Sequence, residues 1–162
     1  MHPTSETIAA NNSVLIEASF GELADKIAIL QIKSVRIADS AKLVNVREEL
    51  QSLAASFENA VQPIVGTSSK RNELDQLVAQ LKIVNETLWQ VEDEIRDCER
   101  AKDFGPRFIE LARTVYRQND HRAVLKRQIN DLLGSRIVEE KSYQNYDSEP
   151  GQCPGQVNQD SK

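Results

Sequence analysis

Glycine and proline, the residues that interrupt helices, are scarce in this sequence, as are histidine, cysteine and the aromatic residues. The 162 residues include six glycines, five prolines, two histidines and two cysteines. No glycine or proline occurs between Gly66 and Gly105, so one helix can run from about Ser69 to Asp103. At about 1.5 Å of rise per residue, this helix would be roughly 50 Å long. The scarcity of helix-breaking residues therefore predicts long, uninterrupted helices.

The shortage of histidine and cysteine argues against a metal centre and against a disulfide-stabilised fold. Neither His2 nor His121 belongs to a Glu-x-x-His pair, and no Cys-x-x-Cys motif occurs. Cys98 lies in the long helical segment and Cys153 near the C-terminus, so we expect no disulfide and a reducing compartment. Glycine-rich phosphate loops and Gly-x-Ser-x-Gly motifs are absent too. We predict no metal and no cofactor.

Long apolar runs and a strong excess of one charge are also missing. The formal net charge is −5, and residues 19–143 hold 20 acidic and 19 basic side chains. This near-neutral balance argues against nucleic acid or an anionic membrane as partner. The longest apolar run in the first twenty residues is Val14-Leu15-Ile16, so we expect no signal peptide and no membrane span. A cytoplasmic protein is the resulting expectation.

Apolar side chains recur three and four residues apart through the long segment, the spacing of one face of an α-helix. This series comprises Leu74, Leu77, Leu81, Val84, Leu88, Val91, Ile95 and Cys98. Trp89 adjoins the series and is interpreted as a core residue. The acidic run Glu92-Asp93-Glu94 is interpreted as a solvated face, because its side chains fan around the helix.

Two shorter helices are predicted before the long one. The first begins at a capping box formed by Ser19 and Glu22. Its apolar side is expected to comprise Leu23, Ala24, Ile27, Ala28, Ile32, Val35 and Ala38, and its polar side Glu22, Asp25, Lys26, Lys33 and Arg36. Ile29 does not fit the polar side and is a candidate for contact with another subunit. The second helix follows Asp39 and Ser40 and is expected to end near Ala60, before a loop at residues 61–68.

A sharp turn and a fourth helix should follow the long one. In Phe104-Gly105-Pro106, glycine suits the left-handed position after a helix and proline the first turn of the next. The fourth helix should run from Pro106 to about Leu133, closed by Gly134-Ser135. Its apolar series is Phe108, Leu111, Val115, Leu125, Ile129 and Leu132, interrupted by Gln118 and Arg122.

These patterns predict an all-α fold, an antiparallel hairpin or bundle of about four helices with one long central helix. We expect a single domain over residues 14–143, a flexible lead-in at 1–13 and a disordered tail at 144–162. Whether residues 14–18 and 136–143 form short strands is left open by the sequence.

The third and fourth helices carry opposite charge. Residues 73–103 hold nine acids and four bases, whereas residues 107–136 hold seven bases and three acids. Antiparallel packing would place Asp97 level with Arg113, although exposed pairs contribute only about 0–1 kcal/mol each. The candidate anion-binding residues are Arg113, Arg117, Asn119, Asp120, Arg122 and Lys126, because arginine forks pair with carboxylate or phosphate. The alternative is that the acidic helix or solvent compensates this charge.

Several short strings resemble a bacterial helical family of unknown function. They are Gly21-Glu22-Leu23, Asp25-Lys26-Ile27, Ile29-Leu30, Leu88-Trp89, Glu92-Asp93, Ile95-Arg96, Phe104-Gly105, Leu111-Ala112-Arg113, Val115-Tyr116, Asn119-Asp120, Leu125-Lys126, Ile129-Asn130, Gly134-Ser135 and residues 138–143. The resemblance spans about residues 14–146 and implies a small bacterial helical protein without implying an activity. The chain departs from the family pattern at Ala24, Ala28, Gln31 and His121. A fainter likeness of helix pattern to all-helical chorismate mutases is an analogy of fold alone.

We favour a non-enzymatic function, that of a protein-interaction or scaffold module that self-associates. The roughly 50 Å helix would outrun the shorter helices available to cover it, so a second copy or another helical protein is the expected partner. The alternative is a small-anion binding protein or isomerase that uses the basic residues of the fourth helix. A cleft around Arg117, Gln118 and Arg122 would favour this alternative.

Overall fold

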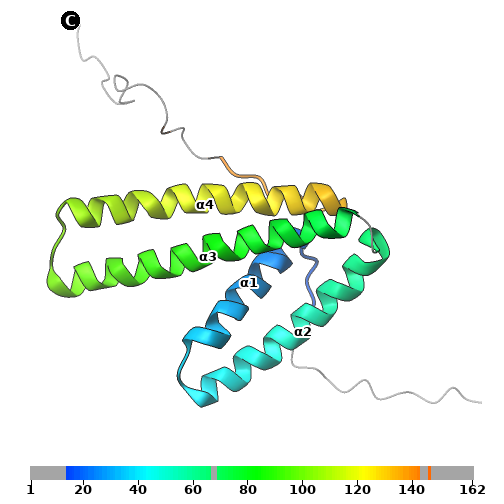
Figure 1. The fold of residues 1–162 in the computed structure, drawn as a ribbon, viewed down its shortest axis with the longest axis horizontal. Helices are drawn as coiled ribbons and strands as arrows, with labels where there is room; N and C mark the ends of the chain where they lie inside the picture. Colours follow the sequence, from blue (N-terminus) through cyan, green and yellow to red (C-terminus); the bar gives the residue numbers. More distant parts are fainter. Residues whose placement is uncertain (1–13, 67–68, 143–145, 147–162) are drawn as a thin grey trace, which may run out of the picture.

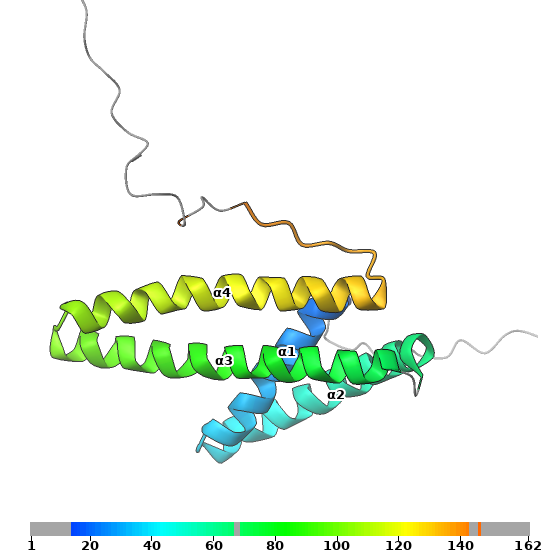
Figure 2. The same cartoon turned by 45° about the horizontal axis from the view of Figure 1, so that its top comes forward.

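The chain forms two helical hairpins that share one end and diverge toward the other (Figures 1 and 2). The computed structural model describes residues 14–66, 69–142 and 146, and no strand occurs within them. The helices are α1 (Phe20–Arg36), α2 (Ser40–Val65), α3 (Ser69–Ala101) and α4 (Pro106–Leu133). The all-α prediction with one long helix is confirmed. The predicted lead-in at 1–13 and most of the predicted tail at 144–162 lie outside the described residues.

Side-chain and backbone caps set most of the helix ends where the sequence predicts them. The Ser19 hydroxyl accepts the Glu22 amide at 3.2 Å and opens α1. The Asp39 carboxylate accepts the amides of Ala41 and Lys42 at 2.9 and 3.2 Å and opens α2. At the end of α4, Gly134 adopts the left-handed conformation with φ of 68°. Each cap satisfies backbone groups that have no partner inside the helix.

The prediction that the second helix ends near Ala60 is wrong, because α2 continues to Val65 with Pro63 inside its last turns. Val61 and Val65 are fully buried, at 0% and 3% exposure, and their burial holds this turn in place. Gly66, with φ of 54°, then ends the helix. Burial of two valines outweighs the single backbone hydrogen bond that a proline removes.

The left-handed residue between α3 and α4 is Lys102, with φ of 55°, and not Gly105 as the sequence suggests. The amide of Asp103, two residues after Ala101, donates to the Cys98 carbonyl at 3.0 Å and closes the end of α3. Gly105 instead has φ of −72° and caps the start of α4. The left-handed residue of the turn is therefore Lys102, three positions before the expected Gly105.

The apolar core lies at the shared end of the two hairpins. It is built from Ala24 of α1, Val61 and Val65 of α2, Leu74, Leu81, Val84 and Leu88 of α3, and Leu125, Ile129 and Leu133 of α4. Phe20 and Phe57 pack edge to face beside it, with ring centroids 6.5 Å apart. The first part of the apolar series predicted for α3, from Leu74 to Leu88, therefore forms the core, whereas Val91, Ile95 and Cys98 lie beyond it.

Divergence of the hairpins changes which side of α1 is covered. Asp25, expected on the polar side, is 1% exposed, and Val35, expected on the apolar side, is 85% exposed. Ile29, the misfit in the sequence pattern, is half-buried. The first turns of α1 lie against α3 and α4, whereas its last turn lies where the hairpins have separated (Figure 1). Periodicity within one helix does not reveal this angle.

The start of α1 approaches the backbone of α4 directly at Gly21. The Gly21 amide donates to Oδ1 of Asn130 at 2.6 Å. A Cβ atom at Gly21 would lie 2.4 Å from the Lys126 carbonyl oxygen, which belongs to a helical backbone and cannot move aside easily. Glycine is therefore required for this helix–helix contact.

We predict that Gly21→Ala lowers the free energy of unfolding by about 1–3 kcal/mol, the usual cost of forcing an extra carbon into a packed contact. Chemical denaturation followed by circular dichroism measures this loss. Gly105→Ala is the matched control, because its Cβ would meet only the end of the Asp103 side chain, at 3.1 Å. Its loss should be smaller, about 1 kcal/mol or less, the cost of replacing glycine by alanine at a helix N-cap. Equal losses in both variants would contradict the close approach.

Candidate functional site

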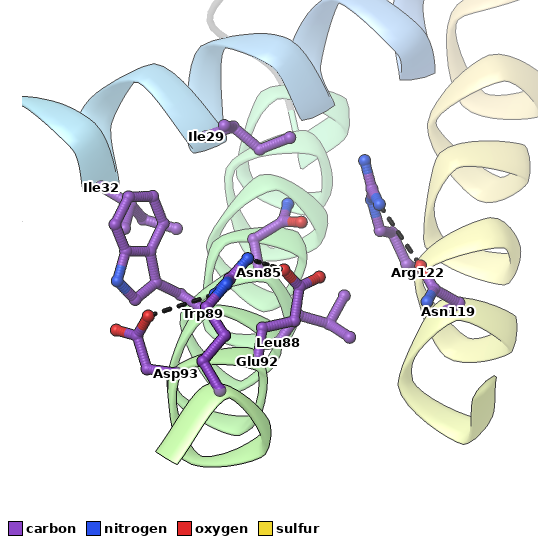
Figure 3. Close-up of a pocket in the computed structure, with 10 residues that line it drawn as sticks. Ile29, Ile32, Asn85, Leu88, Trp89, Glu92, Asp93, Asn119 and Arg122 are labelled. Carbon is purple, nitrogen blue, oxygen red and sulfur yellow. Dashed lines mark hydrogen bonds and ion pairs between the residues drawn. The ribbon is translucent and has the colours of Figure 1, made fainter. Parts of the chain in front are cut away.

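A cleft of about 410 Å³ opens where α1 separates from the α3–α4 hairpin (Figure 3). Its apolar lining consists of Ile29, Ile32, Leu88 and Trp89, and its polar lining of Asn85, Glu92, Asp93, Arg96, Asn119 and Arg122. We call this space the central cleft. Its volume lies within the range of about 300–1,000 Å³ that is typical of small-molecule pockets.

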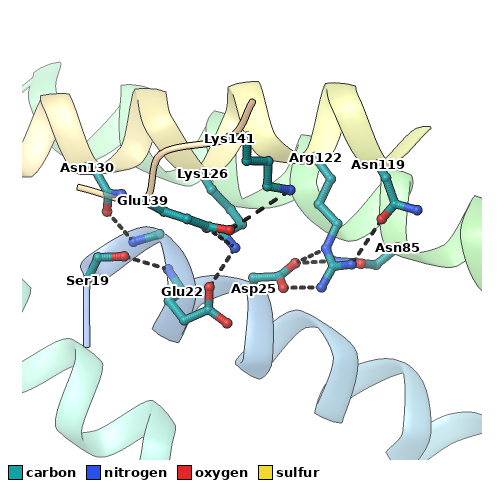
Figure 4. A network of polar contacts seen from close by, with 11 residues as sticks. Ser19, Glu22, Asp25, Asn85, Asn119, Arg122, Lys126, Asn130, Glu139 and Lys141 are labelled. Atoms are coloured by element: carbon teal, nitrogen blue, oxygen red, sulfur yellow. Dashed lines mark hydrogen bonds and ion pairs between the residues drawn. The ribbon is translucent and has the colours of Figure 1, made fainter. Parts of the chain in front are cut away.

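The buried Asp25 carboxylate joins α1, α3 and α4 beside the central cleft (Figure 4). Nε of Arg122 and Nδ2 of Asn85 each donate to Oδ1 of Asp25 at 2.8 Å. Nη2 of Arg122 donates to the other carboxylate oxygen, so the arginine pairs with Asp25 through two parallel hydrogen bonds. This hydrogen-bonded carboxylate raises the pKa of Arg122. Arg122 therefore stays charged at neutral pH.

A second ion-pair cluster surrounds the nearly buried Lys126, one turn further along α4. Its ammonium lies 2.5 Å from Glu22 of α1 and 2.7 Å from Glu139, in the segment that follows α4. Burial alone would lower the pKa of Lys126, but its hydrogen bonds to Glu139 and Glu22 outweigh burial and raise the pKa. The same hydrogen bond lowers the pKa of Glu139. The segment after α4 is thus held against α1 and α4 by charge.

The charged side chains of the central cleft neutralise one another. Arg96 donates to both Glu92 and Asp93 at 3.2 Å, within its own helix. Arg122 is paired with Asp25, and its third donor reaches Oδ1 of Asn119 at 3.4 Å. An incoming anion would have to compete with three carboxylates for two guanidinium groups. The cleft is thus polar and hydrogen-bonding without being strongly basic.

The six candidate anion-binding residues of the sequence prediction divide into separate groups. Asn119 and Arg122 line the central cleft, whereas Lys126 lies in the cluster with Glu22 and Glu139. Arg113 and Arg117 are exposed and lie 3.5 Å from Glu110 of their own helix. Asp120 is half-buried. The geometry therefore does not gather all six around one ligand.

Neighbours on the same helix also balance most of the charge of the acidic third helix. Asp97 pairs with Arg100 and not with Arg113, and Glu92 pairs with Arg96. An ion pair between Glu94 and Arg107 joins α3 to α4 close to their turn. Among the described residues, ion pairing between α3 and α4 is therefore found near the turn that joins the two helices.

The sequence does not predict most of the residues that line the central cleft. The sequence pattern predicts Trp89 in the core and Glu92 and Asp93 on a solvated acidic face, and it predicts Asp25, next to the cleft, on the polar side of its helix. One signal does connect the α3 residues: Asn85, Trp89, Glu92 and Arg96 follow one another by four, three and four positions. This spacing places polar side chains and an indole along one face of the helix.

Comparison of the chain with protein-family models, curated proteins and solved structures finds no match. None of the helices in the described part of the chain is both long enough and apolar enough to cross a membrane. Within the same residues, no group of three or more histidine, cysteine or carboxylate side chains is arranged to hold a metal ion. The geometry of the site itself is therefore the basis for any functional proposal.

We predict that the Glu139–Lys126 contact makes stability sensitive to acid. Because the pKa of Glu139 is lowered by folding, its stabilising effect is present above its unfolded value of about 4.5 and is lost as the pH falls through the folded value. Glu139→Gln should lower the free energy of unfolding by about 1 kcal/mol or less at neutral pH, since the carboxylate is partly exposed. Urea denaturation at neutral pH and near pH 3 measures the difference, which should vanish in acid.

The matched control is Glu140→Gln, because the adjacent Glu140 is 81% exposed and lies 3.5 Å from Arg127. This variant should show a smaller loss at neutral pH. A loss at Glu139 that persists in acid would contradict the assigned ion pair.

Proposed function

We propose that the protein is a cytoplasmic helical interaction module that self-associates through one face of the α3–α4 hairpin. The observation that carries this proposal is an exposed series without charge on each helix. The exposed residues are Gln76, Gln80 and Ile83 on α3 and His121, Val124 and Gln128 on α4, and Thr87 of α3 is half-buried beside them. Steps of three and four residues place each series on one side of its helix. We call these seven residues the uncharged face.

The two series lie on the side of the hairpin away from α1. Ile83 is two residues from Asn85, and Val124 is two residues from Arg122, the two residues that bind Asp25 of α1. Two residues correspond to about 200° around a helix, so both apolar side chains point away from α1. They are accordingly 61% and 54% exposed. The α1–α2 hairpin therefore does not cover Ile83 and Val124 of the uncharged face.

A second copy of the chain is the partner that this face fits. Two copies that each carry a net charge of −5 repel wherever charged surfaces meet, and the uncharged face avoids that cost. Protein interfaces are depleted of charged residues at their centre, and the seven residues of the uncharged face carry no formal charge. A two-fold axis would bring the same face of both copies together, and the two hairpins would form a four-helix bundle.

Analytical ultracentrifugation over a range of protein concentrations tests this proposal. The unchanged protein should sediment as a dimer at micromolar concentration. Val124→Glu and Ile83→Glu should each weaken the dimer by about tenfold or more, because a buried carboxylate without a partner is costly. Circular dichroism should remain unchanged.

Val35→Glu is the matched control, since Val35 is 85% exposed at the end of α1 and lies outside the uncharged face. This variant should dimerise as the unchanged protein does. A monomer at every concentration, or a dimer that all three variants leave intact, would contradict the proposal.

Binding of a small ligand in the central cleft is the second candidate function. The observation in its favour is that Arg122 lines a space of about 410 Å³ together with Asn119 and Trp89. A small anion, as the sequence suggests, is less suited to this space because Arg96 and Arg122 are paired with carboxylates. Trp89 is the single tryptophan of the chain, so its fluorescence reports occupancy of the cleft directly.

A further inference from the structure

The polar groups of the central cleft combine donors and acceptors side by side, with little net charge. On the α3 wall, Glu92 and Asp93 each accept one hydrogen bond from Arg96, and a carboxylate offers about four acceptor positions. Of the five N–H groups of Arg122, three donate to Asp25 and Asn119. Acceptors on one wall and donors on the other thus remain for a ligand.

Hydroxyl groups match this arrangement better than ionic groups do. A hydroxyl both donates and accepts, so the hydroxyls of one ligand can bond an acceptor such as Asp93 at one place and a donor such as Arg122 at another without breaking an ion pair. An anion would lie close to Glu92 and Asp93, and a cation close to Arg96 and Arg122. The balanced charges of the cleft therefore select against both.

Trp89 supplies the apolar surface that a ring-shaped polyol needs. It lies beside Ile32 and Asp93 (Figure 3) and is half-buried, so part of the side chain is accessible. Aromatic rings of this kind bury large apolar areas while their edges meet polar groups. The C–H face of a sugar ring could lie on this indole while its hydroxyls reach the carboxylates and guanidinium groups.

We propose that the central cleft binds a neutral polyhydroxylated ligand of the size of a mono- or disaccharide. The assignment rests on the ligand-binding function proposed for the cleft and names its ligand class. Trp89 provides the stacking surface, Glu92 and Asp93 accept hydroxyl hydrogens, and Arg122 donates to hydroxyl oxygens.

Fluorescence titration of the full chain with defined sugars tests this assignment, with Trp89 as the reporter. Glucose, N-acetylglucosamine and maltose should each be titrated to tens of millimolar, and glucose 6-phosphate and glucosamine serve as the charged counterparts. We expect a saturable change in emission with at least one neutral sugar and weaker binding of its charged counterparts.

Two matched variants locate the binding. Asp93→Ala should weaken the affinity by about tenfold, the value of one or two lost hydrogen bonds. Asp97→Ala removes a carboxylate one turn further along α3, outside the cleft, and should change the affinity by less than about twofold. Circular dichroism and thermal unfolding confirm that both variants are folded.

The possible results distinguish a wrong ligand class from a wrong binding site. A saturable response to the charged sugars alone would overturn the neutral ligand and retain the cleft as a binding site. A response to a neutral sugar that Asp93→Ala leaves unchanged would overturn the assignment of the cleft. No response to any of the five probes would overturn both.

Discussion

One buried ion pair determines how the two hairpins are joined. Asp25 is 1% exposed, and it meets Arg122 of α4 and Asn85 of α3 with donors at 2.8 Å. A carboxylate in this position is tolerated only because these groups satisfy it, since an unpaired buried charge costs several kcal/mol. The pair therefore does more than add stability. It fixes which face of α1 lies against the longer hairpin, and with that the angle at which the hairpins diverge.

The divergence of the hairpins gives the molecule its two proposed functional surfaces. On the side of α1, separation of the hairpins opens the central cleft. Arg122 belongs both to the ion pair and to the cleft lining (Figures 3 and 4). On the opposite side, α3 and α4 expose Ile83 and Val124. The two proposals use opposite sides of one hairpin, so a dimer would leave the cleft open.

The sequence predicts the helices well, because their signals are local. The spacing of Leu74, Leu81 and Leu88, the Ser19 cap and the Gly134 terminus each depend on residues within a few positions. The burial of Asp25 could not be predicted in this way, since its partner Arg122 stands 97 positions later and only the packing angle brings them together. The same reason applies to the cleft, whose residues come from three helices. The sequence pattern does not predict that α2 continues to Val65, because the burial of Val61 and Val65 depends on tertiary packing.

The measurement that tests this account most directly is a double-mutant cycle on the free energy of unfolding with Asp25→Ala, Arg122→Ala and the double variant. Each single change leaves the other charge without its partner, so we expect the double variant to lose about 2 kcal/mol less than the sum of the two single losses. A coupling below about 0.5 kcal/mol would show that the two sites act independently. In that case the Asp25–Arg122 pair would not be what joins the hairpins.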